Sequence, residues 1–343
     1  MTGPSQADPA RRREAVSILS AVGNGQVSVK PRPGESAYGP TGRSAWLDVD
    51  WREHLRWVRV DDRWVNVVDI GSGPAMVFLH GLAGCWQNWL ETIPEFARDH
   101  RVIALDLPGF GESQMPASPI SMPGYASMLD ELFVTLGVDS ATLVGSSMGG
   151  FVAAEFAIRY RAQVERLCLA SPAGLSMEHM RNERNRGARA RVENWLFFGM
   201  GWLAGRDDRV VRRARARRAL VMLVAAYPER LSSTLTVEQV RGAGRPGFKD
   251  ALDAMTGYPL RDRLGEIACP TLIVWGELDR LVPLRDASEF EWLIPGARRI
   301  EYADTGHLVM LERPARFNDD LRAFLDQAPA SPSPWSSPRA ATR

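Results

Sequence analysis

A serine flanked by glycines is the strongest sign of chemistry in this 343-residue chain. Ser147 lies in the pattern Gly145-x-Ser147-x-Gly149, after an apolar run at 141–144 and before a stretch of helical character. In such a pattern a sharp strand-to-helix turn holds the serine in a strained backbone conformation, and the glycines let strand and helix pack without clashing. The neighbouring Ser146 lacks glycines at these offsets. The pattern therefore predicts that Ser147 is a nucleophile.

A serine hydroxyl is a weak nucleophile at pH 7, so it needs an adjacent base that a third group orients. The chain has five histidines, and in this architecture the histidine follows the serine and the acid along the chain. His307 follows an expected strand at 298–302 and is the predicted base. Asp279 follows an expected strand at 271–275 and is the predicted acid, with Glu277 as a rival that the residue pattern does not exclude.

Acyl chemistry also needs hydrogen-bond donors for the oxyanion that develops on the substrate. The backbone amides of Leu82 and Met148 are the predicted donors, because one lies in a glycine-containing turn after an early strand and the other follows the serine. The residues expected near a bound substrate are His80, Gly81, Trp86, Trp89, Trp195, Phe198, Trp202 and Leu308. For Trp86 and Trp89, packing of the helix after the turn is an equal alternative.

Short apolar runs alternate with helical stretches along most of the chain. The runs are 75–79, 102–105, 142–144, 167–170 and 271–275. Runs of this length suit strands that are buried on both faces of a parallel sheet, and their alternation with helices predicts an α/β fold with right-handed crossovers. The alternating pattern over 55–70 predicts an antiparallel hairpin. Active sites of open parallel sheets lie at the carboxyl ends of the strands, where the proposed catalytic residues fall.

The same pass along the chain divides it into five segments. Residues 1–44 and 329–343 are rich in small residues and proline, so we expect a flexible N-terminal arm and a flexible C-terminal tail. An α/β core is expected over 45–173 and 265–328. Between them, residues 174–264 have helical character without a buried-strand pattern, and the stretch is too long for a loop. We interpret it as an inserted helical cap.

Composition excludes several classes of function. The chain has 42 basic and 41 acidic residues, which gives no general attraction to nucleic acid. No apolar run reaches the ~18 residues of a membrane span. Three dispersed cysteines favour neither disulfides nor a metal site, so no metal and no cofactor is expected. A cytoplasmic location is favoured; arginines at 11–13 before a short apolar run leave a twin-arginine export signal as the alternative.

The predicted cap concentrates basic charge. Residues 181–218 contain 12 arginines against 4 acidic residues, and an aromatic stretch at 195–205 lies between two basic clusters. A cap with one solvated basic face is the first explanation. The second is that this segment guides lipid-like or anionic acyl substrates, or touches an anionic membrane surface. No nucleic-acid-binding motif accompanies the arginines.

Five ordered motifs resemble those of the α/β-hydrolase superfamily, in the branch that carries a helical cap. The motifs are His80-Gly81, the run from Asp106 to Ser113, the turn at Ser147, Gly276-x-x-Asp279, and Gly306-His307 followed by Glu312-Arg313-Pro314. The resemblance spans about residues 55–325. It implies an eight-stranded, mostly parallel sheet flanked by helices, cap helices over the site, and a structural role for Asp106. It also implies a triad of Ser147, Asp279 and His307.

A serine at the turn separates this chain from related haloalkane dehalogenases and epoxide hydrolases, which use aspartate there. The resemblance leaves carboxylesterases and lipases, C–C hydrolases of aromatic degradation, cofactor-free haloperoxidases or perhydrolases, and acyltransferases. Residues 147–150 resemble the C–C hydrolases, which usually carry a Gly-Pro-Gly oxyanion loop and an aromatic residue after the histidine. This chain has Leu82-Ala83-Gly84 and Leu308 instead. Both departures favour an ester hydrolase, with a hydrophobic or lipid-like small-molecule ester as substrate. The alternative from another class is a non-catalytic ligand-binding protein of this fold.

Overall fold

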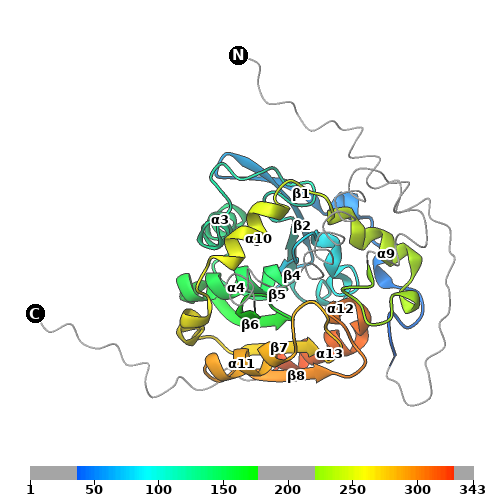
Figure 1. Cartoon of the computed structure of the whole chain (residues 1–343). Coiled ribbons are helices and arrows are strands. Elements are labelled where there is room, and N and C mark those ends of the chain that lie inside the picture. Colours follow the sequence, from blue (N-terminus) through cyan, green and yellow to red (C-terminus); the bar gives the residue numbers. More distant parts are fainter. Residues whose placement is uncertain (1–36, 177–220, 328–343) are drawn as a thin grey trace, which may run out of the picture.

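One sheet of eight strands forms the centre of the molecule. The computed structural model describes residues 37–176 and 221–327. The strands are β1 (Leu55–Val60), β2 (Arg63–Ile70), β3 (Ala75–Leu79), β4 (Arg101–Leu105), β5 (Ala141–Ser146), β6 (Val164–Ala170), β7 (Thr271–Gly276) and β8 (Arg298–Tyr302). Their order is β1-β2-β4-β3-β5-β6-β7-β8, running from top to bottom in Figure 1. β2 pairs antiparallel with β1 and β4, and every other pair is parallel. This is the mostly parallel sheet that the motifs implied.

The sequence patterns account for the antiparallel hairpin strands and for the parallel strands that are buried on both faces. The β1–β2 hairpin turns at Asp61 and Asp62, whose φ angles of 46° and 57° lie in a region that aspartate enters more readily than most residues. In β3, Val77 and Leu79 belong to one core cluster while Phe78 belongs to the other. Successive side chains of a strand point to opposite faces, so the continuous apolar run feeds two cores, one on each side of the sheet.

Helices cover both faces of the sheet (Figure 1). The helices α3 (Met122–Leu136), α4 (Met148–Arg159) and α11 (Arg285–Leu293) contribute to one core cluster. The helices α2 (Ile93–Phe96), α12 (Val309–Glu312) and α13 (Pro314–Leu325) contribute to the other. Short 3-10 turns are η1 (Ala45–Asp48), η2 (Trp51–Glu53), η3 (Trp86–Trp89) and η4 (Arg161–Gln163).

The segment between β6 and β7, where the sequence predicts a cap at 174–264, is helical in its described part. It contains α9 (Ser233–Gln239) and α10 (Phe248–Thr256), with 3-10 turns η5 (Pro228–Arg230), η6 (Val240–Gly242) and η7 (Arg261–Glu266). Residues 177–220 lie outside the described residues, and they include the basic stretch 181–218. The division into core and cap therefore stays a prediction.

Part of the predicted N-terminal arm packs against the core. Tyr38 is buried, and the carboxylate of Glu91 accepts hydrogen bonds from Ser44 Oγ at 2.7 Å and Trp46 Nε1 at 2.8 Å. Within 37–44, the residues of this arm that the structure describes, Tyr38 and Ser44 therefore have partners on the rest of the protein. Residues 1–36 and the predicted C-terminal tail lie outside the described ranges.

Candidate active site

The turn at Ser147 has the geometry that its glycines predict. Ser147 lies between β5 and α4 with φ 54° and ψ −117°, a left-handed region that non-glycine residues rarely enter. A Cβ added to Gly145 would overlap the backbone of Gly149, and one added to Gly149 would overlap the carbonyl of Leu79. Any larger residue at either position would force strand and helix apart, which explains the spacing of the motif.

Hydrogen bonds from adjoining elements hold the strained residue. The Ser147 amide donates to the carbonyl of Ala170, at the end of β6, over 3.0 Å. Its own carbonyl accepts from the amides of Phe151 at 3.1 Å and Ala173 at 3.0 Å. The residue is therefore fixed at the carboxyl edge of the sheet and at the N-terminus of α4, the end that carries partial positive charge.

His307 and Asp279 meet directly. The Nδ1 atom of His307 lies 2.7 Å from Oδ2 of Asp279, and both side chains are almost fully buried. Oδ1 of Asp279 accepts from the amides of Leu281 and Val282 at 2.8 and 2.9 Å. One carboxylate oxygen is thus fixed by the acid's own turn, and the other orients the imidazole. The rival acid, Glu277, is exposed.

Because Nδ1 of His307 binds Asp279, the second imidazole nitrogen, Nε2, is the one that could accept a proton. When the ring is neutral, a hydrogen bond to a carboxylate requires the proton on Nδ1, so Nε2 of His307 carries a lone pair. Nε2 is buried and has no hydrogen-bond partner among the described residues. A buried polar atom without a partner calls for an explanation, and a catalytic base is one.

The strand order brings the predicted residues to one edge. Ser147 follows β5, Asp279 lies shortly after β7, and His307 lies shortly after β8. The ends of β6 and β7 are joined where the Ser171 amide donates to the Val274 carbonyl at 2.9 Å. All of these loops leave the carboxyl ends of neighbouring parallel strands, which is where sites occur in open α/β sheets.

The turn with the predicted oxyanion donor passes beside the serine. A Cβ on Gly81 would lie 3.1 Å from Cβ and 3.7 Å from Oγ of Ser147. The turn closes with a 2.9 Å bond from the Gly84 amide to the Gly81 carbonyl. Within the described ranges, neither the Leu82 amide nor the Met148 amide donates a hydrogen bond. Neither amide is therefore used by another group there, as the predicted role of oxyanion donor requires.

His80 is buried and both of its ring nitrogens have partners, so its predicted place near the substrate stays a prediction while its structural contacts are plain. Its side chain is fully buried. Its Nδ1 lies 2.7 Å from the Gly81 carbonyl, and its Nε2 accepts from the Leu107 amide at 2.9 Å. Burial lowers the pKa of His80 to about 4, so the ring is neutral at pH 7. This histidine ties the turn beside the serine to the loop after β4.

Trp86 and Trp89 pack in the core, as their alternative interpretation holds. The rings of Trp86 and Trp51 lie 5.0 Å apart, and those of Trp89 and Phe78 lie 5.1 Å apart. All four side chains belong to the same core cluster, and Leu308 packs against it while partly exposed. The predicted pocket residues Trp195, Phe198 and Trp202 lie outside the described residues.

Asp106 holds loops in place, as the resemblance implied. It is buried and accepts from Asn66 Nδ2 at 2.9 Å and from the amides of Trp86 and Glu112 at 2.8 and 2.9 Å. Burial raises the pKa of Asp106, while these hydrogen bonds oppose the shift because they stabilise the carboxylate. Its partners fix the turn beside the serine and the loop after β4.

Sequence reasoning missed the contacts made by the segment between β6 and β7. The Val224 carbonyl accepts from the amides of His307 and Leu308 at 3.0 and 3.1 Å. A Cβ on Gly242 would overlap the backbone of Gly84. No motif marks these positions, since each contact is made by backbone atoms that any residue carries. A glycine at position 242 is compatible with a close approach of two backbones, but the sequence does not show which segment approaches it.

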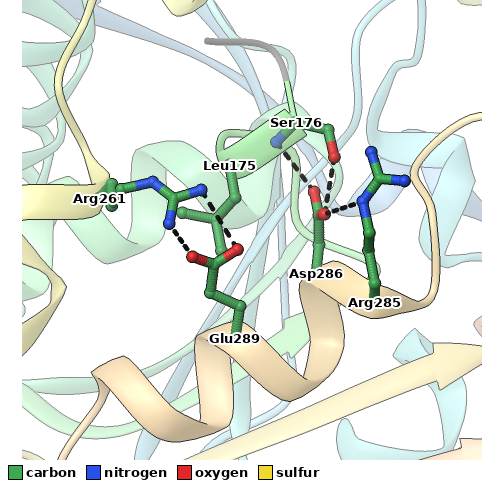
Figure 2. A pocket seen from close by; sticks show the side chains of 6 residues that line it. All are labelled: Leu175, Ser176, Arg261, Arg285, Asp286 and Glu289. Carbon is green, nitrogen blue, oxygen red and sulfur yellow. Dashed lines mark hydrogen bonds and ion pairs between the residues drawn. The ribbon is translucent and has the colours of Figure 1, made fainter. Parts of the chain in front are cut away.

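A pocket of about 230 Å³ lies elsewhere, where the chain leaves the core near residue 176 (Figure 2). Ion pairs and hydrogen bonds cross it. Arg261 pairs with Glu289, and Asp286 accepts from the Ser176 amide and hydroxyl at 2.9 and 2.6 Å. None of the three proposed catalytic residues lines it. The charged side chains that line this pocket bind other residues of its lining, which is typical of a structural contact.

A family model decides the broader identity. Residues 74–314 match the model described as alpha/beta hydrolase fold. The chain belongs to the α/β-hydrolase family. This α/β hydrolase is 30% identical over 275 residues to 2-hydroxy-6-oxo-2,4-heptadienoate hydrolase of Pseudomonas putida, an alignment that covers 76% of this chain and 92% of that relative.

Solved structures agree with the family. A membrane phospholipase A described as a bacterial virulence factor superposes with a TM-score of 0.62 and 27% identity, over 79% of this chain and 85% of that chain. A meta-cleavage product hydrolase superposes with a TM-score of 0.63 and 23% identity, over 81% of this chain and all of that chain. In the α/β hydrolase described here, residues 37–176 and 221–327 include no helix suited to crossing a membrane and no metal-binding cluster.

Proposed function

We propose that this α/β hydrolase cleaves a carboxylic ester through an acyl-enzyme on Ser147. One observation carries the proposal: the 2.7 Å contact between His307 Nδ1 and Asp279 Oδ2, at the sheet edge where Ser147 lies. A carboxylate in that place fixes the imidazole tautomer and stabilises the imidazolium that forms during reaction. A purely structural histidine would not need a buried Nε2 without a partner in the described residues.

Acylation uses groups that all lie at this edge. His307 Nε2 takes the proton of Ser147 Oγ while Oγ attacks the ester carbonyl carbon. The carbonyl oxygen becomes an oxyanion, and the amides of Leu82 and Met148 donate to it. The C–O bond to the alcohol then breaks, and His307 returns its proton to the leaving alkoxide.

Deacylation repeats the sequence with water. His307 Nε2 takes a proton from a water molecule while the water oxygen attacks the acyl carbon. The second tetrahedral intermediate uses the same two amides, and its collapse expels Ser147 Oγ, which regains its proton from His307. The carboxylic acid leaves, and the enzyme returns to its starting state. No metal or cofactor takes part in the proposed steps.

The proposed substrate is an ester with a hydrophobic or lipid-like acyl group. Leu82-Ala83-Gly84 in the oxyanion turn and Leu308 after the histidine support an ester over a ring-fission product, because they differ from the usual C–C hydrolase residues. The likeness to a phospholipase A at 27% identity also supports it. Contact of the basic stretch 181–218 with an anionic membrane, and a cytoplasmic location, stay predictions.

C–C bond hydrolysis is the second candidate. The observation that favours it is the 30% identity to 2-hydroxy-6-oxo-2,4-heptadienoate hydrolase, which spans 92% of that relative. A second relative, 2-hydroxy-6-oxo-6-phenylhexa-2,4-dienoate hydrolase of Comamonas testosteroni, is also 30% identical over 93% of its length. The same serine, histidine and amides would serve either reaction, so substrate choice separates the two.

A substrate panel tests the proposal. p-Nitrophenyl esters from acetate to palmitate and a ring-fission dienoate are offered to the wild type and to Ser147→Ala. We expect the wild type to have a higher kcat/KM on one of the esters than on the dienoate, and the variant to be inactive on both. A preference for the dienoate would replace ester hydrolysis by the second candidate. Inactivity of folded wild type on every substrate would contradict both.

A further inference from the structure

A buried carboxylate joins three segments of the chain beside His307. Glu312, in α12, is fully buried and accepts four hydrogen bonds. The donors are the Tyr38 hydroxyl at 2.6 Å, the Ala226 and Gly306 amides at 2.8 Å each, and the Leu308 amide at 3.1 Å. They come from the N-terminal segment, from the segment between β6 and β7, and from both neighbours of the histidine. Burial raises the pKa of Glu312, and these bonds oppose the shift by stabilising the carboxylate.

These bonds fix the backbone that carries the proposed base. Gly306 and Leu308 flank His307, so one carboxylate holds the main chain on both sides of it. The Val224 carbonyl accepts from the His307 amide at 3.0 Å and completes the support. Neither group forms a hydrogen bond with the imidazole. The 2.7 Å contact from the ring to Asp279 therefore depends on where this backbone holds the ring.

Of the four donors to Glu312, Tyr38 is the most distant from it in the sequence. Its hydroxyl accepts from the Tyr227 amide at 2.9 Å and donates to Glu312. The guanidinium groups of Arg313 and Arg230 lie 4.9 and 5.0 Å from the centre of its ring, which keeps the ring in place. Burial beside Glu312 raises the pKa of Tyr38, so the hydroxyl keeps the proton that it donates.

We propose that Tyr38 is a positioning residue of the active site, acting through Glu312 on the backbone of His307. The inference rests on the proposed function, since it takes His307 as the base. Tyr38 lies outside residues 74–314, the part that matches the family model. Loss of its hydroxyl would leave the Tyr227 amide without this partner and would remove one of the three hydrogen bonds that Oε2 of Glu312 accepts. A carboxylate that shifts after losing this bond would move the Gly306 and Leu308 amides, which it still binds.

Two matched hydroxyl deletions test this positioning role. Tyr38→Phe removes the hydroxyl and keeps the ring next to Arg313 and Arg230. Ser44→Ala is the control: its hydroxyl also links the N-terminal segment to a carboxylate, that of Glu91, at 2.7 Å. The other side-chain donor to Glu91 is Trp46, so this anchor is separate from the histidine loop. Glu312→Gln keeps the shape of the acceptor and removes its charge.

The measurements are kcat and KM on an ester, and the low-field proton NMR signal of the His307 Nδ1–H group. We expect Tyr38→Phe to lower kcat by about tenfold, the effect of one hydrogen bond, and to broaden or shift the low-field signal while KM changes little. Glu312→Gln should lower kcat further and should change the low-field signal more. Ser44→Ala should leave kcat and the signal as in the wild type.

Each outcome supports or overturns the proposal. Wild-type kcat and an unchanged signal in Tyr38→Phe would overturn it, even if the melting temperature fell, because that is the result of a merely structural contact. Equal losses in Tyr38→Phe and Ser44→Ala would also overturn it. If the wild type hydrolyses no ester, the proposed function fails separately, and the low-field signal still shows whether Tyr38 governs the contact between His307 and Asp279.

Discussion

The proposed nucleophile and the proposed base are held in different ways. Ser147 is fixed by its immediate surroundings: the glycines of its own motif and backbone bonds to β6, to α4 and to the turn after β6. His307 is fixed partly by distant segments: by the Val224 carbonyl, and by Tyr38, which binds the nearby Glu312 carboxylate. A local device can be encoded in five consecutive residues. Glu312 belongs to the motif that follows His307, but the contributions of Val224 and Tyr38 come from distant segments and leave no short motif in the sequence.

The difference predicts which changes affect chemistry and which affect folding. Changes at the serine turn should disturb the packed strand and helix and so reduce stability. Changes around the histidine should alter the geometry of the base while the core stays folded. The following substitutions test this contrast.

Asp279→Asn should have the largest effect on turnover. The amide cannot stabilise the imidazolium and favours the wrong tautomer, so we expect kcat to fall by about 10⁴-fold. Glu277→Gln is the matched control, since that side chain is exposed two residues away, and it should change kcat by less than about twofold. Steady-state kinetics on the best ester measure both. Equal effects of the two substitutions would contradict the assignment of the acid.

Gly149→Ala should act on folding. The Cβ of the new alanine would overlap the Leu79 carbonyl. Because a backbone group cannot rotate away as a flexible side chain can, we expect the unfolding free energy to fall by about 3 kcal/mol. Gly257→Ala is the control, because the nearest atom to its Cβ would be Asp253 O at 3.5 Å. It should change stability by less than about 0.5 kcal/mol. Urea unfolding measures both, and similar stabilities would show that the turn is less tightly packed than described.

His80 should make the serine side of the site sensitive to acid. Its folded pKa of about 4 lies below the ordinary value near 6.5, so the unfolded chain binds more protons between these values. The stability contributed by neutral His80 is complete above about pH 6.5 and is lost as the pH falls toward 4. We expect a loss of about 2 kcal/mol between pH 7.5 and 5.

His80→Gln supplies the comparison for this pH effect. Its amide can still donate to the Gly81 carbonyl and accept from the Leu107 amide, but it does not titrate. Unfolding free energies of both proteins are measured from pH 8 to 4. The wild type should lose more stability on acidification than the variant. Parallel curves would mean that His80 is not the buried neutral group described here.

Gly242→Ala should have the smallest of these effects. Its Cβ would overlap the Gly84 backbone, so the turn with the Leu82 amide must shift, and we expect kcat to fall by about tenfold through weaker oxyanion stabilisation. Gly265→Ala is the control, with its nearest atom, Leu293 O, at 3.8 Å. Unchanged kcat in Gly242→Ala would show that the segment between β6 and β7 does not position this turn.

The sequence predicts the fold and the serine turn well, because both follow local rules. Continuous apolar runs mark strands buried on two faces, and the glycines beside Ser147 mark one close approach. The residue pattern favoured Asp279 but did not exclude Glu277, since both residues follow the same strand; the structure places Asp279 against His307. The burial of His80 could not be predicted, because a histidine after a strand has the same pattern whether it is buried or lines a pocket. Tyr38 and Val224 act through tertiary contacts that no local pattern records.

Labelling with a fluorophosphonate probe tests the central claim most directly. The probe is offered to the wild type, Ser147→Ala and Ser146→Ala, and the labelled peptide is identified by mass spectrometry. Ser146 is the natural control because it adjoins the proposed nucleophile in the same turn. We predict a single adduct on Ser147 in the wild type and in Ser146→Ala, and none in Ser147→Ala. Folded wild type that takes no label, or a label that persists in Ser147→Ala, would contradict the account.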